Sequence, residues 1–93
     1  MIIGVATIKL YVPWAYSLKE KRMVVKSIVS KVQNKFNVSI SEIDAQDIHQ
    51  TIILGIAYVT GDTRLADSMI DTVITFIEHH TEAEILDICR EIR

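Results

Sequence analysis

The first residues of the chain alternate in polarity with the period of a β-strand. One side of the segment from Ile2 to Val12 carries Gly4, Ala6, Ile8, Leu10 and Val12. The other side includes Thr7 and Lys9, so we expect it to be the more solvated side of the strand. Pro13 follows directly and ends the pattern.

A helical period begins a few residues later and continues for about five turns. Ser17 and Glu20 have the spacing of a capping box, in which each side chain satisfies a free backbone donor, so the helix should begin at Leu18. We expect it to end near Phe36 and to be followed by a short strand around Ile40. Its buried stripe consists of Leu18, Val25, Ile28, Val29, Val32 and Phe36.

The second half of the chain predicts a strand, a helix and a final strand. The run from Thr51 to Thr60 is rich in β-branched residues, as expected of a central strand. Asp62 is a good N-cap for a helix that ends near His79, and the last strand should extend from Glu84 to Ile92. The apolar side of this helix consists of Ala66, Met69, Ile70, Val73, Phe76 and Ile77. One side of the last strand carries Leu86, Ile88 and Ile92.

The resulting order, β-α-β-β-α-β, defines a fold of the α+β class. Because crossovers are right-handed, both helices should cover one face of a four-stranded antiparallel sheet with strand order 4-1-3-2. This is the ferredoxin-like plan, and residues 1–93 are enough for one such domain without a second core. The opposite face of the sheet is then left uncovered by the chain itself.

The strand from Thr51 to Thr60 is apolar on both sides, so its orientation has to be inferred. We expect the small residues Gly55 and Ala57 to face the helices, which leaves an apolar patch on the open face. This patch consists of Val5, Leu54, Ile56 and Tyr58. It should pack against a second copy of the protein, as a homodimer, or against another partner. The strand also partly resembles a motif of RNA-recognition domains, but Tyr58 is its single ring, whereas a stacking platform needs several.

The chain carries a net charge of −2, but the charge is distributed unevenly. Seven Lys and Arg residues and only Glu20 lie between Met1 and Phe36, whereas three Arg residues and eleven carboxylates follow. The molecule should therefore have a basic end or face of net +6 and an acidic one of net −8.

The densest group of cations lies at the start of the first helix. Lys19, Arg22 and Lys26 share a solvent-facing stripe, and two of them lie in the first turns of the helix, where free N–H groups already make the potential positive. An anionic partner such as a phosphate would compensate this arrangement, and the alternative is an ordinary solvated helix face. Lys21 falls on the buried side, so its ammonium group must either reach solvent past the edge of the sheet or meet a carboxylate, and we expect the internal ion pair. We nevertheless include Lys21 with the other three as a candidate nucleic-acid contact.

Other chemistry receives little support from the sequence. Asp47 and His49 form the most enzyme-like segment, in the turn from Asp44 to Gln50, yet a lone histidine in a turn is a weak signal for a general base. No spacing suits a metal or a cofactor, and Cys89 has no close basic neighbour on its own side of the strand that would make its thiol reactive. The single cysteine and the lack of a leader or membrane-spanning pattern predict a cytoplasmic protein without a membrane partner.

Four stretches of the chain are similar in sequence to a known family. They are Ser17 to Arg22, Phe36 to Glu42, Asp47 with Gln50, and Leu54 with Gly55. Together they resemble the bacterial YlxP-like family of small proteins of unknown function. The resemblance implies a ferredoxin-like fold and an association with transcription and translation genes, which suggests contact with RNA or the ribosome. The family often has a tryptophan at the position of His49, and it supplies no catalytic residues.

The sequence leaves two main hypotheses for function. The leading one is a non-enzymatic protein that contacts RNA phosphates, on the ribosome or elsewhere, through Lys19, Lys21, Arg22 and Lys26. The other is a homo-oligomeric module that assembles through the open face of the sheet. A small enzyme built around the turn from Asp47 to Gln50 is the remaining alternative.

Overall fold

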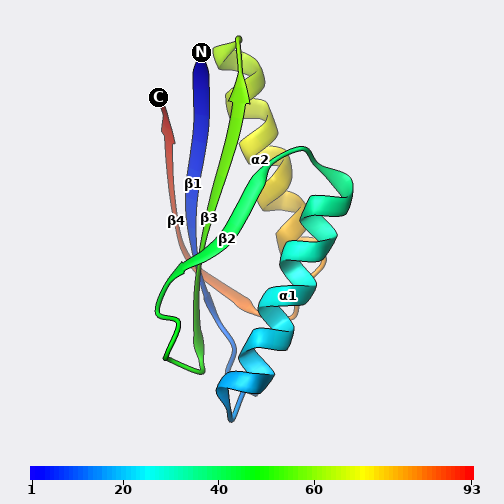
Figure 1. Ribbon diagram of the computed structural model, residues 1–93, viewed down its shortest axis with the longest axis vertical. Helices are drawn as coiled ribbons and strands as arrows, with labels where there is room; N and C mark the ends of the chain where they lie inside the picture. Colours follow the sequence, from blue (N-terminus) through cyan, green and yellow to red (C-terminus); the bar gives the residue numbers. More distant parts are fainter.

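The structure is a computed structural model that describes residues 1–93 as four strands and two helices (Figure 1). The elements are β1 (Ile2–Tyr11), α1 (Leu18–Lys35), β2 (Ser39–Asp44), β3 (Thr51–Thr60), α2 (Thr63–His79) and β4 (Glu84–Ile92). The strands form one antiparallel sheet in the order β2-β3-β1-β4, and both helices lie on the same side of it. The predicted ferredoxin-like βαββαβ architecture is therefore confirmed.

Side-chain caps define the starts of both helices, as the sequence predicts. The N–H of Glu20 donates a hydrogen bond to Ser17 Oγ at 3.2 Å. The N–H of Arg64 donates one to Asp62 Oδ1 at 2.8 Å. The Glu20 carboxylate accepts a hydrogen bond from the Tyr16 N–H at 3.4 Å rather than from Ser17, so the capping box is shifted by one residue.

The core lies between the sheet and the two helices. Ala6, Ile8 and Leu10 of β1 are buried in it, whereas Thr7 and Lys9 on the other side of the strand are exposed, as predicted. The helices contribute Ile28 and Val32 from α1, and Ala66, Ile70, Val73, Ile74 and Ile77 from α2. Each helix is apolar on one side, and neither is long and apolar enough to cross a membrane.

The orientation of β3 is opposite to the predicted one. β3 pairs with β1 in a register that places Ile56 beside Ala6 and Leu54 beside Ile8. Cross-strand partners point to the same face of a sheet, so Ile52, Leu54 and Ile56 all lie on the helix side, where they are buried. The prediction is wrong because large apolar side chains gain more free energy from burial than the small residues on the other side of the strand.

Gly55 pairs with Thr7 and so faces the open side of the sheet, where a bulge in β2 fills the space next to it. The register between β2 and β3 shifts between Glu42 and Asp44, which leaves Ile43 as an extra residue. A Cβ atom at position 55 would lie 2.9 Å from Ile43 Cγ2, closer than side chains normally approach. The small residue therefore permits a close contact on the open face and does not mark the helix side.

A second bulge changes which residues of β4 face the helices. The pairing of β1 with β4 shifts between Lys9 and Leu10, where Leu86 is the extra residue and is exposed. Ile85 and Ile88 pack against the core. The prediction that Leu86 and Ile88 share one side of a regular strand is therefore wrong.

Candidate functional site

Lys21, near the start of α1, is fully buried, with 0% of its side chain exposed. Its Nζ donates hydrogen bonds to the carbonyl oxygens of Ala45, Thr51 and Gln46 at 2.7, 3.2 and 3.3 Å. Glu42 Oε2 lies 2.8 Å from Nζ and supplies the counter-charge, without an aligned hydrogen bond of its own. The expected internal ion pair is confirmed. The prediction that Lys21 contacts nucleic acid is wrong, because its charge is compensated and inaccessible.

The buried lysine fastens α1 to the turn between β2 and β3. An ammonium group has three protons, and three backbone carbonyls at this turn accept them. Ala45, one of these acceptors, has a φ of 55°, in the left-handed region that residues other than glycine rarely adopt. The contact with Lys21 thus stabilises a backbone conformation that alanine does not favour by itself. Lys21 has a structural role and is not part of the candidate site.

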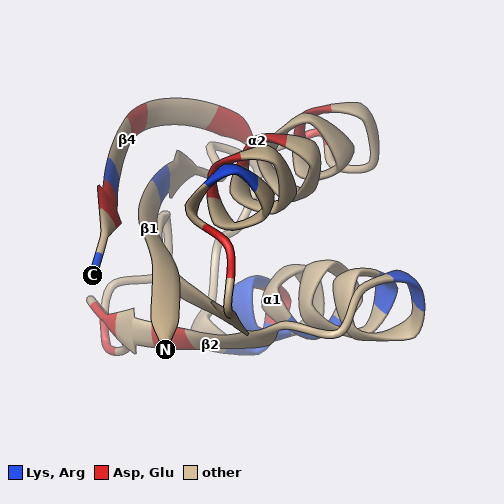
Figure 2. Ribbon diagram, turned by 90° about the horizontal axis from the view of Figure 1, so that it is seen from above, with Lys and Arg blue, Asp and Glu red and all other residues tan.

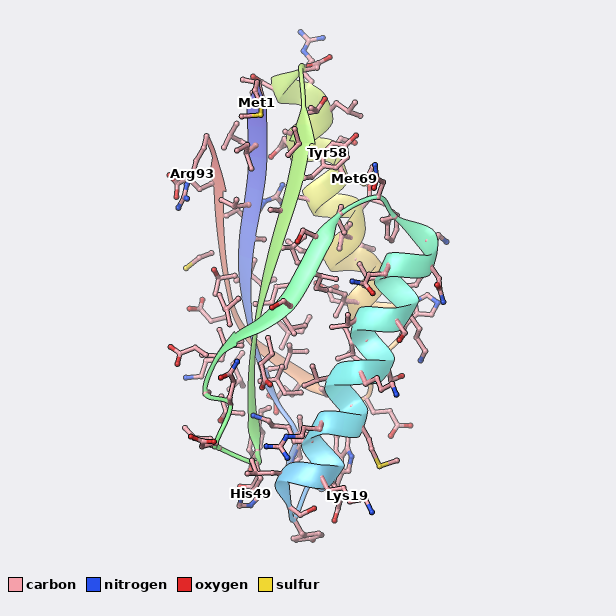
Figure 3. The ribbon with its side chains drawn as sticks, in the orientation of Figure 1. Met1, Lys19, His49, Tyr58, Met69 and Arg93 are labelled. Carbon is pink, nitrogen blue, oxygen red and sulfur yellow. The ribbon has the colours of Figure 1, made fainter.

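The other three cations of the predicted set are exposed, and we call Lys19, Arg22 and Lys26 the basic stripe. Figure 3 shows Lys19 at the start of α1, directed away from the sheet. All four ion pairs of the structure lie elsewhere, at Lys21 and at the arginines near the C-terminus. No carboxylate of the chain therefore forms an ion pair with the basic stripe.

Charges of opposite sign lie on different parts of the molecule. Figure 2 shows Lys and Arg residues along α1, and Asp and Glu residues along β4 and α2. In β4, Arg90 is held by Asp67 and Asp71 of α2 at 2.9 and 3.1 Å, so this arginine is already paired. The uncompensated positive charge of the molecule is thus concentrated on α1.

Two further lysines extend the positive surface of α1 toward α2. Lys31 Nζ donates a hydrogen bond to the His80 carbonyl oxygen at 3.3 Å. Lys35 Nζ lies 5.1 Å from the centroid of the Phe76 ring. A carbonyl oxygen and a ring face stabilise an ammonium group without neutralising it, so both lysines keep their charge at the surface. The sequence prediction included neither of them in the site.

The loop between β1 and α1 buries its smallest side chain and exposes its largest ones. Ala15 is 0% exposed, whereas its neighbours Trp14 and Tyr16 are 39% and 79% exposed. Large aromatic side chains at fixed, exposed positions are typical of recognition surfaces. Sequence reasoning missed both residues. The available signal was a pair of aromatic residues that flank an alanine immediately before a basic helix.

A shallow groove of about 360 Å³ lies between Trp14, α1 and the segment that follows α2. From α1 it is lined by Met23, Ser27 and Lys31 among others, and from the opposite side by His80, Thr81 and Glu82. Residues four apart are neighbours on a helix surface, so Lys19 continues the slowly rotating row of Met23, Ser27 and Lys31 toward the start of α1. The groove thus adjoins the basic stripe at one end and includes Lys31 at the other.

The open face of the sheet carries a different apolar patch from the predicted one. Of the four predicted residues, Val5 alone lies on this face. Leu54 and Ile56 are buried under the helices, and Tyr58 packs half-buried against the same core, so the prediction that these three face outward is wrong. The observed open-face patch consists of Ile3, Val5, Ile43, Ile53, Ala57 and Val59. Val59 is its most exposed member, at 61%.

The turn that contains the enzyme-like segment is exposed and borders no cavity. Asp47 and His49 are both exposed, and neither lines any of the hollows of the surface. Cys89 is exposed as well. No group of three His, Cys, Asp or Glu side chains is arranged to hold a metal ion. The geometry gives no support to catalysis at this turn.

The sequence matches known proteins over almost its full length. Residues 3–90 match the family described as "Protein of unknown function (DUF503)". The uncharacterized protein YlxP of Bacillus subtilis (strain 168) is 45% identical over 83 residues, which cover 89% of this chain and 90% of that protein. The resemblance to the YlxP-like family is therefore confirmed.

A solved structure supports the architecture independently. A de novo designed protein with a ferredoxin fold, determined by NMR in solution, matches with a TM-score of 0.57 over 100% of this chain and 85% of its own. It is 19% identical in sequence, so the similarity shows the fold alone.

The family match and the Bacillus relative each cover most of the length of this chain. The chain therefore belongs to the DUF503 family of proteins of unknown function.

Proposed function

We propose that the protein binds RNA, without catalysing a reaction on it, and that the basic stripe of α1 contacts the RNA phosphates. Lys19, Arg22 and Lys26 carry the proposal, because they are exposed and unpaired. Lys19 and Arg22 also lie in the first turns of α1, where free N–H groups add positive potential. An anion bound there stabilises both the cations and the helix end. The net charge of the whole chain is −2, so anions are attracted to this face and not to the molecule in general.

RNA suits this surface better than other polyanions because aromatic side chains adjoin the cations. Trp14 and Tyr16 are exposed immediately before α1. Cations attract any partner that carries phosphates, whereas aromatic rings also stack on unpaired bases. An anionic membrane or an acidic protein offers no such planar bases, and binding to either of them is an alternative outcome of the test.

Replacing Lys19, Arg22 and Lys26 together with Glu is expected to weaken RNA binding by at least about a hundredfold at low salt. Each substitution exchanges attraction to a phosphate for repulsion, and like charges that are brought together cost several kcal/mol. All three side chains are exposed, so the variant should remain folded. The measurement is the fluorescence anisotropy of a labelled single-stranded RNA titrated with protein.

Arg64→Glu is the matched control, because Arg64 is an exposed cation at the start of α2, at the opposite end of the molecule from the start of α1 (Figure 1). Its RNA affinity should equal that of the unmodified protein. Equal affinities of the triple variant and the unmodified protein would overturn the proposal. Binding to vesicles of phosphatidylserine and phosphatidylcholine, or to an acidic peptide, without any binding to RNA would overturn it as well.

A second candidate function is the assembly of two copies through the open face of the sheet. The open-face patch favours it, because no other part of the chain covers these apolar side chains. Exposed apolar patches often mark interfaces, and a twofold axis would cover the patches of both copies at once. The patch and the basic stripe lie on different faces, so dimerisation and RNA binding are compatible.

Val59→Asp is expected to convert such a dimer into a monomer, because it places a carboxylate inside an apolar interface. Light scattering of the two proteins at equal concentration measures the change in mass. Leu65→Asp is the control, since Leu65 is an exposed apolar residue of α2 away from the sheet. An unmodified protein that is monomeric at its highest soluble concentration would exclude this function.

A further inference from the structure

We infer that the groove beside Trp14 receives an unpaired base of single-stranded RNA, which stacks on the indole ring while other phosphates of the same strand contact Lys19 and Lys31. This site rests on the proposed function, because it assumes that RNA binds along α1. The inference goes beyond the proposed function in two respects. It specifies that the bound RNA is single-stranded, and it names the side chain that selects this form. Trp14 becomes a binding residue, and duplex RNA becomes the poorer ligand.

Hydrogen bonds hold the backbone of the loop both before and after Trp14. The Val12 N–H donates to the Gln50 carbonyl oxygen at 2.8 Å, and the Ala15 N–H donates to the Val12 carbonyl oxygen at 3.1 Å. Gln50 Nε2 donates to the Pro13 carbonyl oxygen at 3.2 Å. The burial of Ala15 fixes the backbone next to the indole ring, which stays partly exposed. A rigid aromatic side chain loses little conformational freedom when it binds a ligand.

The groove has the size and the lining that a planar base requires. Its volume of about 360 Å³ lies within the usual range of small-molecule sites, roughly 300–1,000 Å³. Trp14 and Met23 supply apolar surface, and a thioether sulfur makes favourable contacts with aromatic rings. The hydroxyl groups of Ser27 and Thr81 can donate hydrogen bonds to the base edge or accept them from it.

Charges around the groove direct the RNA backbone along α1. Lys19, Met23, Ser27 and Lys31 follow one another at four-residue spacing. Cations therefore lie at both ends of a row about 18 Å long. Glu82 lines the opposite wall and repels phosphates, which keeps the backbone on the α1 side and lets the base point into the groove.

Single-stranded RNA can use the charges and the ring together, whereas a duplex cannot. A base in a duplex is paired and stacked on its neighbours, so its flat face is not free to contact an aromatic side chain. The duplex retains its phosphates and can still contact Lys19 and Lys31. We therefore expect the protein to prefer single-stranded RNA to duplex RNA. Trp14, and not the lysines, should cause this preference.

Trp14 is the single tryptophan of the chain, so intrinsic fluorescence reports on this ring alone. Single-stranded oligoadenylate of about 12 nucleotides should quench the tryptophan emission, whereas its duplex with oligouridylate should not. Trp14→Ala should weaken binding of labelled single-stranded oligoadenylate by about tenfold and leave duplex binding unchanged. Trp14→Phe, which keeps a stacking ring, should retain most of the affinity.

Unchanged single-strand affinity of the Trp14→Ala variant, or equal affinities of the unmodified protein for single strand and duplex, would overturn base stacking and leave phosphate binding by α1 intact. Absence of binding to either RNA form would instead overturn the proposed function itself. Circular dichroism identifies a Trp14→Ala variant that fails to fold. In that case the unmodified protein decides, because unquenched emission at saturating single strand contradicts stacking.

Discussion

Ile56→Asp is expected to unfold the protein and not merely to disrupt an interface. Ile56 is buried on the helix side of β3, between Ala6 of β1 and Ile40 of β2, which are buried too. Loss of the isoleucine side chain alone costs about 2–5 kcal/mol, and a carboxylate among apolar neighbours adds the cost of its dehydration. The sum is comparable to the whole stability of a small domain, about 5–15 kcal/mol.

Val59→Asp on the same strand is the matched control for this prediction. Val59 lies on the opposite side of β3 and is mostly exposed, so the same substitution there should leave a folded protein. Urea denaturation followed by circular dichroism separates the two cases. A cooperative transition of the Ile56→Asp variant at the urea concentration of the unmodified protein would mean that Ile56 faces solvent.

Lys21→Met should lower the free energy of unfolding by about 3–5 kcal/mol. Methionine preserves the length and apolar stem of the side chain but removes the ammonium group. The substitution leaves the Glu42 carboxylate without its counter-charge. It also removes the donor from the carbonyl oxygens of Ala45, Gln46 and Thr51. Urea denaturation measures the loss.

Two further variants show how much of the stability loss in Lys21→Met comes from the unpaired buried charge. Lys26→Met removes an exposed lysine of the same helix and should alter stability by about 0.5 kcal/mol or less. Combining Lys21→Met with Glu42→Met should recover part of the loss, because no unpaired charge then remains inside. A loss below about 1 kcal/mol for Lys21→Met alone would show that Lys21 does not fasten α1 to the turn.

The sequence predicted the fold because each element is marked locally. Ser17 and Asp62 cap the two helices, and Thr7 and Lys9 mark the solvated side of β1. β3 has no such polar marker, so its orientation depends on the register with β1, which is a long-range property. The larger apolar volume on the side of Ile52, Leu54 and Ile56 was the available signal, and the small size of Gly55 was misleading.

The two bulges explain the remaining differences in the sheet. A period of two assigns residues to sides correctly only while the strand is regular. Ile43 and Leu86 are each an extra residue, so the assignment changes at these points. Nothing in the local sequence around either residue distinguishes a bulge from a regular strand.

The candidate site was predictable on α1 and not beyond it. Helical periodicity placed Lys19, Arg22 and Lys26 on the solvent side and Lys21 on the buried side, because that pattern is local. The groove brings Trp14 close to Lys31 and to the segment after α2, which are distant in the sequence. The packing of the helices on the sheet brings these segments together, and local sequence patterns do not predict that packing.

The salt dependence of RNA binding by the unmodified protein is the sharpest test of phosphate recognition by α1. Lys19, Arg22 and Lys26, with Lys31 as a fourth contact, predict that the logarithm of the association constant falls linearly with the logarithm of the salt concentration. For a single strand the expected slope is between about −2 and −3. A slope near zero, or no binding at the lowest salt concentration, would contradict phosphate recognition by these residues.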